Sequence, residues 1–416
     1  MSRSSDTDGR LVKLSKGRKD LLTQLLGMES KQILEQGVAG TIRELLVLMA
    51  ELLVNTEVIE KAGERYGRDP EKSCSRWGTQ AGSVLVMEQR VPIKKQRLRA
   101  GGANGSEVEL ATYEQLNNKD FLNEQAGAKL LSGVSTRRFE KTVEQLLRGK
   151  GIGRQTISRR GIADMTRKLE EFRERSLEGL DILVVFVDGI HLGETVYVTA
   201  VGIDSQGRKH VLGFEPGSTE SSGVCRSLLS NLIERKILDE SGGVLFVVDG
   251  GKGLKKAIRE VFNKRVQVQR CTVHKKRNVQ DKLPKKEHEE FNQKFNAAYN
   301  KKSFKEAEKA FVALQRELII KRRSAAANSL TEGLLEILTL HRLGIQGTLK
   351  RSLNTTNCIE SVFSAARYYT RNVKRWNKEE QMERWIAAGL LEAEQKLRKV
   401  PGYTGLNKLK QALRKA

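Results

Sequence analysis

Short apolar runs and amphipathic segments alternate between residues 181 and 269. Continuous apolar runs bounded by turn residues are typical of buried strands, whereas apolar residues at every third or fourth position are typical of helices. The turn Asp204–Gly207 joins two of the strands as a hairpin, and Ser218 and Thr219 are expected to cap a helix. The predicted elements, in chain order, are strands 182–187, 195–203 and 209–214, helix 220–238, strand 244–248, helix 254–262 and strand 266–269.

This order predicts a mixed sheet that opens with an antiparallel meander and continues through α/β crossovers. Among compact folds, the order is typical of the ribonuclease-H-like architecture. We therefore expect an α/β protein with a ribonuclease-H-like core, whose first part spans residues 176–284.

The region before this core has a different pattern. An apolar stripe within residues 1–60 predicts a helix, and the stripe is either a core face or a dimer seam. Alternation around residues 83–87 and 91–93 predicts short strands, and residues 100–106 have the composition of a loop. We expect residues 1–110 to serve in dimerisation or DNA binding. The stripe consists of Ile42, Leu45, Leu46, Met49, Leu52 and Leu53.

Two helical segments, 134–147 and 156–172, flank a glycine-bearing turn at 149–153. This arrangement is compatible with a helix-turn-helix in a domain over 111–175, since the second segment opens with side chains that could reach bases and phosphates. An ordinary helical hairpin is the alternative. The cations expected to contact DNA here are Arg154, Arg159 and Arg160.

The chain beyond the core is also helical in period. Apolar residues keep helical spacing from Lys285 to Leu340, which predicts an all-α insertion over 285–345. A final helix is predicted to begin at the capping cluster Asn354–Asn357, and residues 346–416 would complete the core and end in a basic tail.

The charge favours an anionic partner. Lys and Arg outnumber Asp and Glu 75 to 51, which gives a net charge of +24. Because this charge is spread along the chain and not gathered in one amphipathic segment, nucleic acid is favoured over a membrane surface. The 4 dispersed cysteines and the absence of a secretory signal predict a soluble protein of the cytoplasm.

Three carboxylates stand where metal-dependent chemistry would need them. Asp188 follows the first predicted strand and Asp249 the fourth, so both could meet at one sheet edge and share Mg²⁺ or Mn²⁺. Glu360 lies at the margin of the apolar face of the final helix and could join them. The alternatives are that Asp-Gly is a common turn dipeptide and that Glu360 complements the helix dipole.

A basic segment follows Asp249. Between residues 263 and 288, 9 Lys or Arg stand against 2 acids, which makes the segment a candidate phosphate track or a solvated basic face. Cys271 and His274 have the spacing of half a zinc site, but nothing completes it, so a structural or DNA-contacting role is preferred. Residues 250–253 do not have the spacing of a nucleotide-binding P-loop.

Segments 249–258, 269–279 and 356–361 resemble, in the same order, signature segments of the Mutator-like bacterial insertion-sequence transposases. The resemblance implies a ribonuclease-H-like core, a helical insertion and an Asp-Asp-Glu triad, which falls on Asp188, Asp249 and Glu360. Segment 372–376 resembles the basic, aromatic stretch that would contact transposon-end DNA. The residues that we expect to bind DNA in this part of the chain are Cys271, His274, Lys275, Lys276, Arg277, Arg367, Arg371, Lys374, Arg375 and Trp376.

The hypothesis is therefore a DNA transposase that binds the terminal inverted repeats of its element, cleaves its ends and joins them to target DNA. It would use two metal ions, act as a homodimer or higher oligomer, and be associated with the bacterial nucleoid. A ribonuclease-H-like nuclease or resolvase without strand transfer, and a non-catalytic DNA-binding regulator, are the alternatives.

Overall fold

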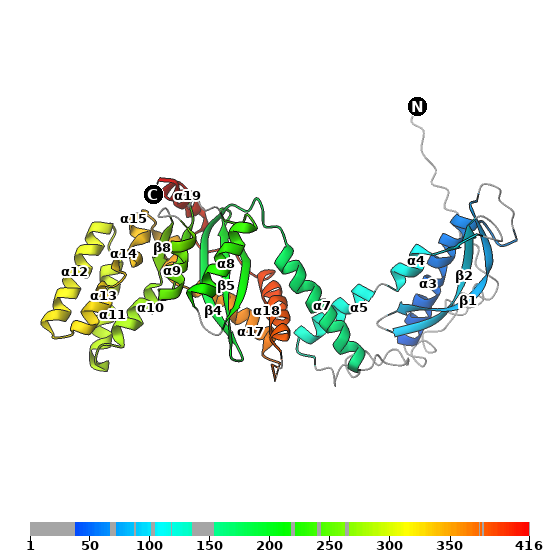
Figure 1. Cartoon of the computed structure of the whole chain (residues 1–416), viewed down its shortest axis with the longest axis horizontal. Helices are drawn as coiled ribbons and strands as arrows, with labels where there is room; N and C mark the ends of the chain where they lie inside the picture. The colour runs from blue at the N-terminus through cyan, green and yellow to red at the C-terminus, as the bar shows by residue number, and fades with distance from the viewer. Residues whose placement is uncertain are drawn as a thin grey trace, which may run out of the picture. The chain divides into compact units, whose positions relative to one another are not determined.

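The computed structural model of the chain divides into two compact units, residues 1–164 and 165–416 (Figure 1). Each unit is described separately. The residues that the structure describes are 38–66, 72–86, 89–100, 105–117, 119–134, 154–217, 221–238, 243–262, 266–373, 375–376 and 378–415.

The first unit contains a helix, α3 (Val38–Ala62), packed on a three-stranded antiparallel sheet. The sheet is a long hairpin, β1 (Cys74–Val86) and β2 (Gln89–Ala100), extended by the short β3 (Glu107–Val108). The predicted strands around 83–87 and 91–93 are therefore confirmed, and they are parts of longer ones.

The buried face of α3 differs from the predicted stripe. Ala50, Val54 and Val58 recur at every fourth residue and pack on the sheet. Of the predicted stripe, Leu45, Met49 and Leu53 are 40%, 53% and 52% exposed. The helix has two apolar faces, and periodicity alone does not reveal which of them meets the sheet.

Within the described ranges, the hairpin is followed by the helices α4 (Ala111–Leu116), α5 (Lys119–Leu131) and α7 (Arg154–Glu174). Helix α7 confirms the predicted helix 156–172. Gly161 of α7 and Gly127 of α5 let the two helices cross closely, because a side chain at either glycine would meet Leu130 or Asp164. The predicted turn 149–153, and nearly all of the helix before it, lie outside the described residues, so the helix-turn-helix stays a prediction.

The second unit is built on a five-stranded sheet in the order β6-β5-β4-β7-β8. Strands β6, β5 and β4 are antiparallel, whereas β4, β7 and β8 are parallel. This mixed α/β sheet, with its opening meander, confirms the predicted order of elements. The strands are β4 (Ile182–Leu192), β5 (Thr195–Asp204), β6 (Lys209–Gly217), β7 (Leu245–Val248) and β8 (Gln267–Arg270).

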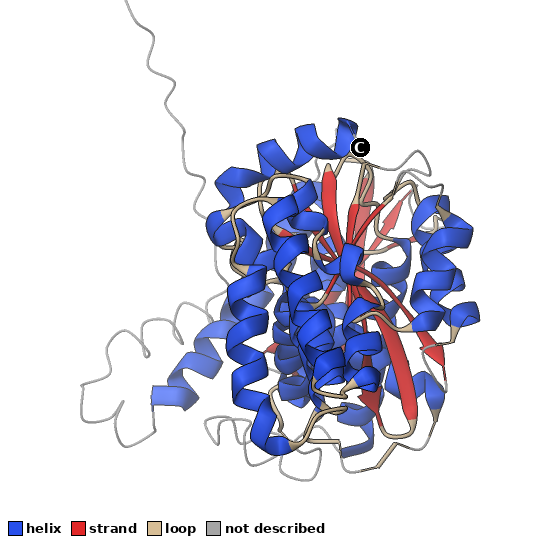
Figure 2. Ribbon diagram, turned by 90° about the vertical axis from the view of Figure 1, so that its left-hand side faces the viewer, coloured by secondary structure: helices blue, strands red, loops and turns tan. Residues whose placement is uncertain are grey.

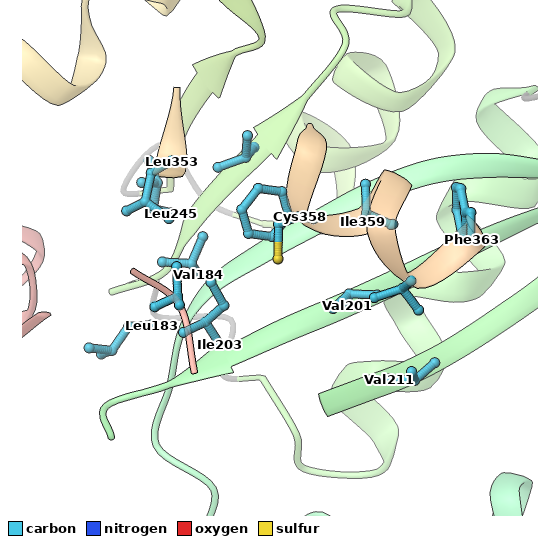
Figure 3. Close-up of a cluster of buried hydrophobic side chains, with 14 of the residues drawn as sticks. Leu183, Val184, Val201, Ile203, Val211, Leu245, Leu353, Cys358, Ile359 and Phe363 are labelled. Atoms are coloured by element: carbon cyan, nitrogen blue, oxygen red, sulfur yellow. The ribbon is translucent and has the colours of Figure 1, made fainter. Parts of the chain in front are cut away.

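Helices cover both faces of this sheet, so its strands are apolar on both sides (Figure 2). Val184 and Phe186 point into one core, and Val185 and Val187 point into the other, as the two-residue period of a strand requires. Figure 3 shows Ile359 and Phe363 of α17 (Asn357–Thr370) packed into the first core. The covering helices are α8 (Ser222–Glu234) and α9 (Lys252–Val261) on one face, and α17 (Asn357–Thr370), α18 (Glu379–Glu394) and α19 (Leu406–Lys415) on the other.

Helix α8 corrects one predicted boundary. It begins at Ser222 and ends at Glu234, and its cap is Ser221, whose side chain accepts a hydrogen bond from the Val224 N–H. The predicted cap at 218–219 lies outside the described residues. Four Ser or Thr residues within the five positions 218–222 do not reveal which of them adopts the backbone conformation of an N-cap.

Helices fill the chain between β8 and α17 and form their own apolar core, which confirms that residues 285–340 contain no strand (Figure 1). The domain boundaries stay predictions. None of the helices in the described ranges is long and apolar enough to cross a membrane. The elements are α10 (Thr272–Gln280), η2 (Lys285–Glu287), α11 (His288–Tyr299), α12 (Phe304–Ile320), α13 (Ser324–Thr331), α14 (Leu334–Ile337), α15 (Thr339–Arg342) and α16 (Gly347–Leu353); η3 (Tyr403–Gly405) precedes α19.

Candidate active site

The three parallel strands of the second unit, β4, β7 and β8, lie side by side in the sheet. Val187 of β4 pairs with Val248 of β7, which in turn pairs with the last residue of β8. Asp188, Asp249 and Cys271, each one residue further along, therefore form a row across three neighbouring strands. The carboxyl ends of parallel strands are where open α/β sheets bind ligands.

Both aspartates are half-buried. Asp249 stands in the turn after β7, whereas Asp188 lies inside β4, which continues to Leu192 and does not end at Val187 as predicted, because residues 188–192 still pair with β5. Asp188 Oδ1 accepts a hydrogen bond from the Gly189 N–H at 2.9 Å, and Asp249 Oδ1 accepts one from the Gly251 N–H at 2.7 Å. Gly250 has a φ of +101°, which glycine adopts without strain. The turn after β7 thus orients the Asp249 carboxylate.

Thr356 links Glu360 to the row of strand ends. Its hydroxyl donates to Glu360 Oε1 at 3.1 Å, and it lies 3.4 Å from His274 Nδ1 and 3.6 Å from Cys271 Sγ. The predicted capping cluster included this threonine, but the Thr356 side chain makes no capping hydrogen bond. It joins the first turn of α17 to the start of α10 instead.

Cys271 and His274 form a polarised pair inside the site. Burial raises the pKa of the Cys271 thiol, but its hydrogen bonds, that with His274 foremost, outweigh burial and leave the pKa below its usual value. The hydrogen bond with Cys271 raises the pKa of His274, and the charges of Asp249 and Asp188 raise it further. The imidazole therefore lies within the electric field of both aspartates.

The donor set is suited to a hard divalent cation, since carboxylate oxygens are the ligands that Mg²⁺ and Mn²⁺ prefer. Asp188 and Asp249 stand on adjacent strands, and Glu360 is exposed on the first turn of α17. Within the described part of the chain, no three His, Cys, Asp or Glu side chains are gathered closely enough to hold a metal ion. Asp188 and Asp249 therefore lie on neighbouring strands, and Glu360 is linked to the same region through Thr356, but the three carboxylates are not in a ligating arrangement.

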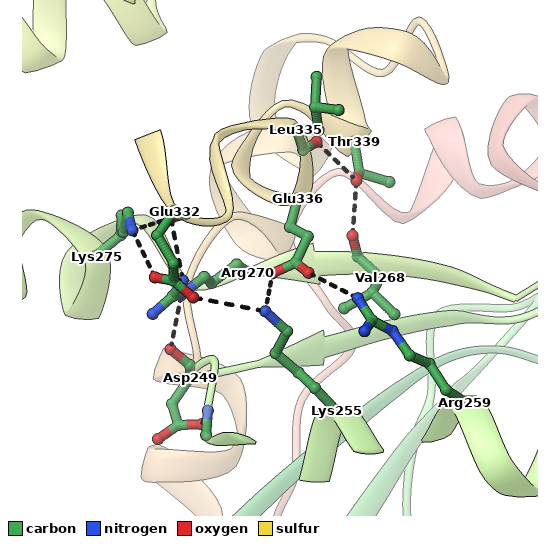
Figure 4. A network of polar contacts seen from close by, with 11 residues as sticks. Asp249, Lys255, Arg259, Val268, Arg270, Lys275, Glu332, Leu335, Glu336 and Thr339 are labelled. Atoms are coloured by element: carbon green, nitrogen blue, oxygen red, sulfur yellow. Dashed lines mark hydrogen bonds and ion pairs between the residues drawn. The ribbon is translucent and has the colours of Figure 1, made fainter. Parts of the chain in front are cut away.

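A buried ionic network lies beside Asp249 (Figure 4). The Arg270 side chain, 5% exposed, donates to the Asp249 carbonyl oxygen at 3.4 Å and to Glu332 Oε2 at 2.6 Å. Lys275, which is fully buried, donates to the same Glu332 oxygen at 3.0 Å. Glu332 belongs to the helical region, so the network ties that region to the turn that carries Asp249.

The structure therefore gives Lys275 an ionic role inside the protein in place of the predicted DNA contact. Sequence reasoning missed this network, although one signal was present. Cys271, Lys275 and Val279 recur at every fourth residue of one helix and are all buried. A lysine on such a face needs a buried anionic partner. Cys271, at 1% exposure, is also closed to direct contact with DNA.

The other predicted DNA contacts differ in exposure. Lys276 and Arg160 are half-buried, and the Arg154 side chain and Lys374 lie outside the described residues. Trp376 is half-buried and packs against the core that contains α17. The predicted contacts that are exposed cations are Arg159, Arg277, Arg367, Arg371 and Arg375.

Comparison with known proteins shows the family of this chain. The sequence model of a family described as "Transposase, Mutator family" matches residues 17–399. The transposase for insertion sequence element IS6120 of Mycolicibacterium smegmatis is 31% identical over 59% of this chain and 75% of its own length. The transposase for insertion sequence element IS256 in transposon Tn4001 of Staphylococcus aureus is 25% identical over 88% of this chain and 93% of its own length. The chain therefore belongs to the Mutator family of transposases.

Proposed function

We propose that this protein binds the terminal inverted repeats of an insertion sequence, cleaves the element's ends and joins them to target DNA. The observation that carries the proposal is the register of β4 against β7, which sets Asp188 beside Asp249, with Glu360 linked to the same edge through Thr356. The relatives named as insertion-sequence transposases support the reaction, and the net charge of +24 supports DNA as the substrate.

The order of the strands supports a ribonuclease-H-like core. Three antiparallel strands are followed by two parallel ones, and the first of the three lies in the middle of the sheet. The helical region then falls between the last strand and the helix that carries Glu360. Both features match the expectation drawn from the family's signature segments.

In this mechanism Asp188, Asp249 and Glu360 would hold Mg²⁺ or Mn²⁺. Bound metal would supply activation of the attacking oxygen and stabilisation of the leaving 3′ oxygen. The turn at Gly250 orients the Asp249 carboxylate, and the Thr356 hydroxyl orients that of Glu360. Because in-line phosphoryl displacement mainly needs positioning and charge neutralisation, the protein need not form a covalent bond to DNA.

The test is a strand-transfer assay with a labelled duplex of the inverted repeat that flanks the gene, a target plasmid and Mg²⁺. Wild type should give joined products, whereas Asp188→Asn and Asp249→Asn should bind the duplex and give none. Asp281→Asn, an exposed aspartate that ends α10, is the matched control and should keep full activity.

The outcome also separates the competing functions. Cleavage without joining would identify a nuclease or resolvase. Binding without either product in the wild type would identify a regulator. Full activity of Asp249→Asn would refute the assignment of the site. Because two ends must be brought together, we expect the active species to be at least a dimer, which light scattering of the protein–DNA complex would measure.

A further inference from the structure

The outer side of α9 is a continuous row of cations. Its members occupy positions i, i+3, i+4 and i+7, which lie on one face of a helix. The opposite face is apolar and buried against the sheet. The cations, called the α9 row below, are Lys252, Lys255, Lys256 and Arg259.

Two adjoining hollows run along the α9 row, with volumes of about 460 Å³ and about 310 Å³. Lys255 and Arg259 line both of them. The larger hollow has apolar walls that include Phe262 and Leu335, and Arg342 adds a fifth cation to its rim. The surface is therefore concave as well as basic.

The α9 row starts at the candidate active site. Its first cation, Lys252, follows Gly251, whose N–H holds the Asp249 carboxylate. The row then leads away from Asp249 along the helix axis for about 10 Å, at 1.5 Å per residue. That length corresponds to roughly three phosphates of one DNA strand, at 3.4 Å of axial rise each.

We infer that the α9 row is a binding site for the sugar–phosphate backbone of the DNA strand that enters the candidate active site. The inference rests on the proposed function and adds to it a contact surface made of cations that are not among the predicted DNA contacts. Glu336 holds Lys255 at 2.9 Å and Arg259 at 3.8 Å, so these two form the wall of the site (Figure 4). Lys252 and Lys256 are exposed and are the cations that reach the phosphates.

The charge pattern separates the α9 row from an ordinary solvated helix face. On α12, exposed cations alternate with acids, as in Lys305, Glu306, Glu308 and Lys309, so that phosphate attraction is offset locally. On α9, the sole acid is Glu260 at its far end, which lies 2.5 Å from Arg226 and 3.8 Å from Lys256, so the helix itself sets one acid against the four cations of the α9 row.

The test compares DNA binding by two double variants in an Asp249→Asn background, so that binding is measured without cleavage. Lys252→Gln/Lys256→Gln removes two cations of the α9 row. Lys305→Gln/Lys309→Gln removes two exposed cations with the same i, i+4 spacing on α12 and is the matched control. Each is titrated by fluorescence anisotropy, at several salt concentrations, against the inverted-repeat duplex and an unrelated duplex of equal length.

The logarithm of the binding constant falls linearly with the logarithm of the salt concentration, and removal of two phosphate contacts should make this fall less steep by about 1.8, at 0.9 per phosphate. The affinity ratio of parent to variant should therefore shrink by roughly tenfold between 50 and 200 mM salt. A loss on the inverted-repeat duplex alone would place the element's end on the α9 row, and a loss on both duplexes would show that target DNA also binds there.

The inference would be overturned if the salt dependence of binding by Lys252→Gln/Lys256→Gln were as steep as that of the parent, or as steep as that of the α12 variant. All four lysines are exposed, so we expect the two variants to have equal thermal unfolding midpoints. Equal midpoints would show that a difference in DNA binding does not come from a difference in folding. Failure of the proposed function would look different from failure of this inference. The wild type would then neither cleave nor join DNA, while the Lys252→Gln/Lys256→Gln variant would still show a weaker salt dependence of DNA binding.

Discussion

Replacement of Glu332 by Gln should lower the free energy of unfolding, because it leaves two cations buried beside the candidate active site without their anionic partner. Arg270 and Lys275 are 5% and 0% exposed, and both donate to the same Glu332 carboxylate oxygen. Glu332→Gln removes the negative charge but keeps the backbone carbonyl that both cations also contact. The variant thus isolates the charge.

The size of the effect follows from the burial on each side. Loss of one partner from a buried ion pair costs ~3–5 kcal/mol, whereas exposed pairs contribute ~1 kcal/mol or less. The cations are buried but the Glu332 side chain is 56% exposed, so solvent screens part of the attraction. We therefore expect a loss of about 2 kcal/mol at pH 7, midway between these limits.

The pH dependence gives the prediction its sign. Burial opposes ionisation of Glu332, but hydrogen bonds from Arg270 and Lys275 hold its pKa at about 2, below the usual 4.5. The stabilisation is therefore present above pH 4.5 and is lost as the pH falls towards 2. Wild type should lose stability over this acid range, and Glu332→Gln should lose less.

In alkaline solution, the stability of the variant should depend on pH more strongly than that of the wild type. Burial and the nearby Arg270 already lower the pKa of Lys275 below 10.5, and Glu332 counters them. Without that carboxylate the pKa should fall further. Since the unfolded chain would then bind more protons than the native one, the stability of Glu332→Gln should rise as the pH increases towards 10.5.

Urea unfolding followed by tryptophan fluorescence, at pH 3, 4, 7 and 9, measures these changes. Glu290→Gln is the matched control, because Glu290 also pairs with two lysines, Lys294 and Lys321, but all three side chains are at least 39% exposed. The double variant Glu332→Gln/Lys275→Met should recover part of the loss. If Glu332→Gln were no less stable than Glu290→Gln, the argument that burial decides the energy of this network would be refuted.

Two further substitutions test the turn and the threonine of the candidate site. Gly250→Ala should reduce stability by ~1–3 kcal/mol and slow end cleavage, because Gly250 has a φ of +101° and a Cβ there would lie 2.8 Å from Arg270 Nη2. The control Gly243→Ala should lose less stability, because Gly243 also has a positive φ, +84°, but no atom lies within 4 Å of the added Cβ. Thr356→Val should slow cleavage roughly tenfold, equivalent to about 1.4 kcal/mol for a hydrogen bond to a carboxylate, with Thr356→Ser restoring the rate. An unchanged cleavage rate in Thr356→Val would remove the threonine from the mechanism.

The central sheet could be predicted from the sequence because its strands are buried on both faces. Such strands carry unbroken apolar runs, as in 182–187 and 244–248, and these runs are visible without any tertiary information. The two aspartates follow from the same signal, since each stands at the end of one run. Their adjacency needed only the parallel pairing of β4 with β7.

The face of α3 could not be predicted in the same way. Its apolar residues cover more than half of the helix circumference, and the sheet selects one face through contacts with residues such as Ile93 and Leu98, which lie far along the chain. Leu45, Met49 and Leu53 remain exposed in the described structure. Periodicity gives the helix, whereas the sheet decides the face.

The misinterpretation of Lys275 has a different physical cause. In a basic segment every lysine has the same composition around it, and the sequence gives no direct sign that the anionic partner of this one stands 57 residues away. Its helical position next to Cys271 and Val279 was the available sign of burial. Because a buried ammonium group requires an anion, that position would have predicted an acidic partner for Lys275, whereas the identity of Glu332 and the contact with the turn that carries Asp249 needed the tertiary structure.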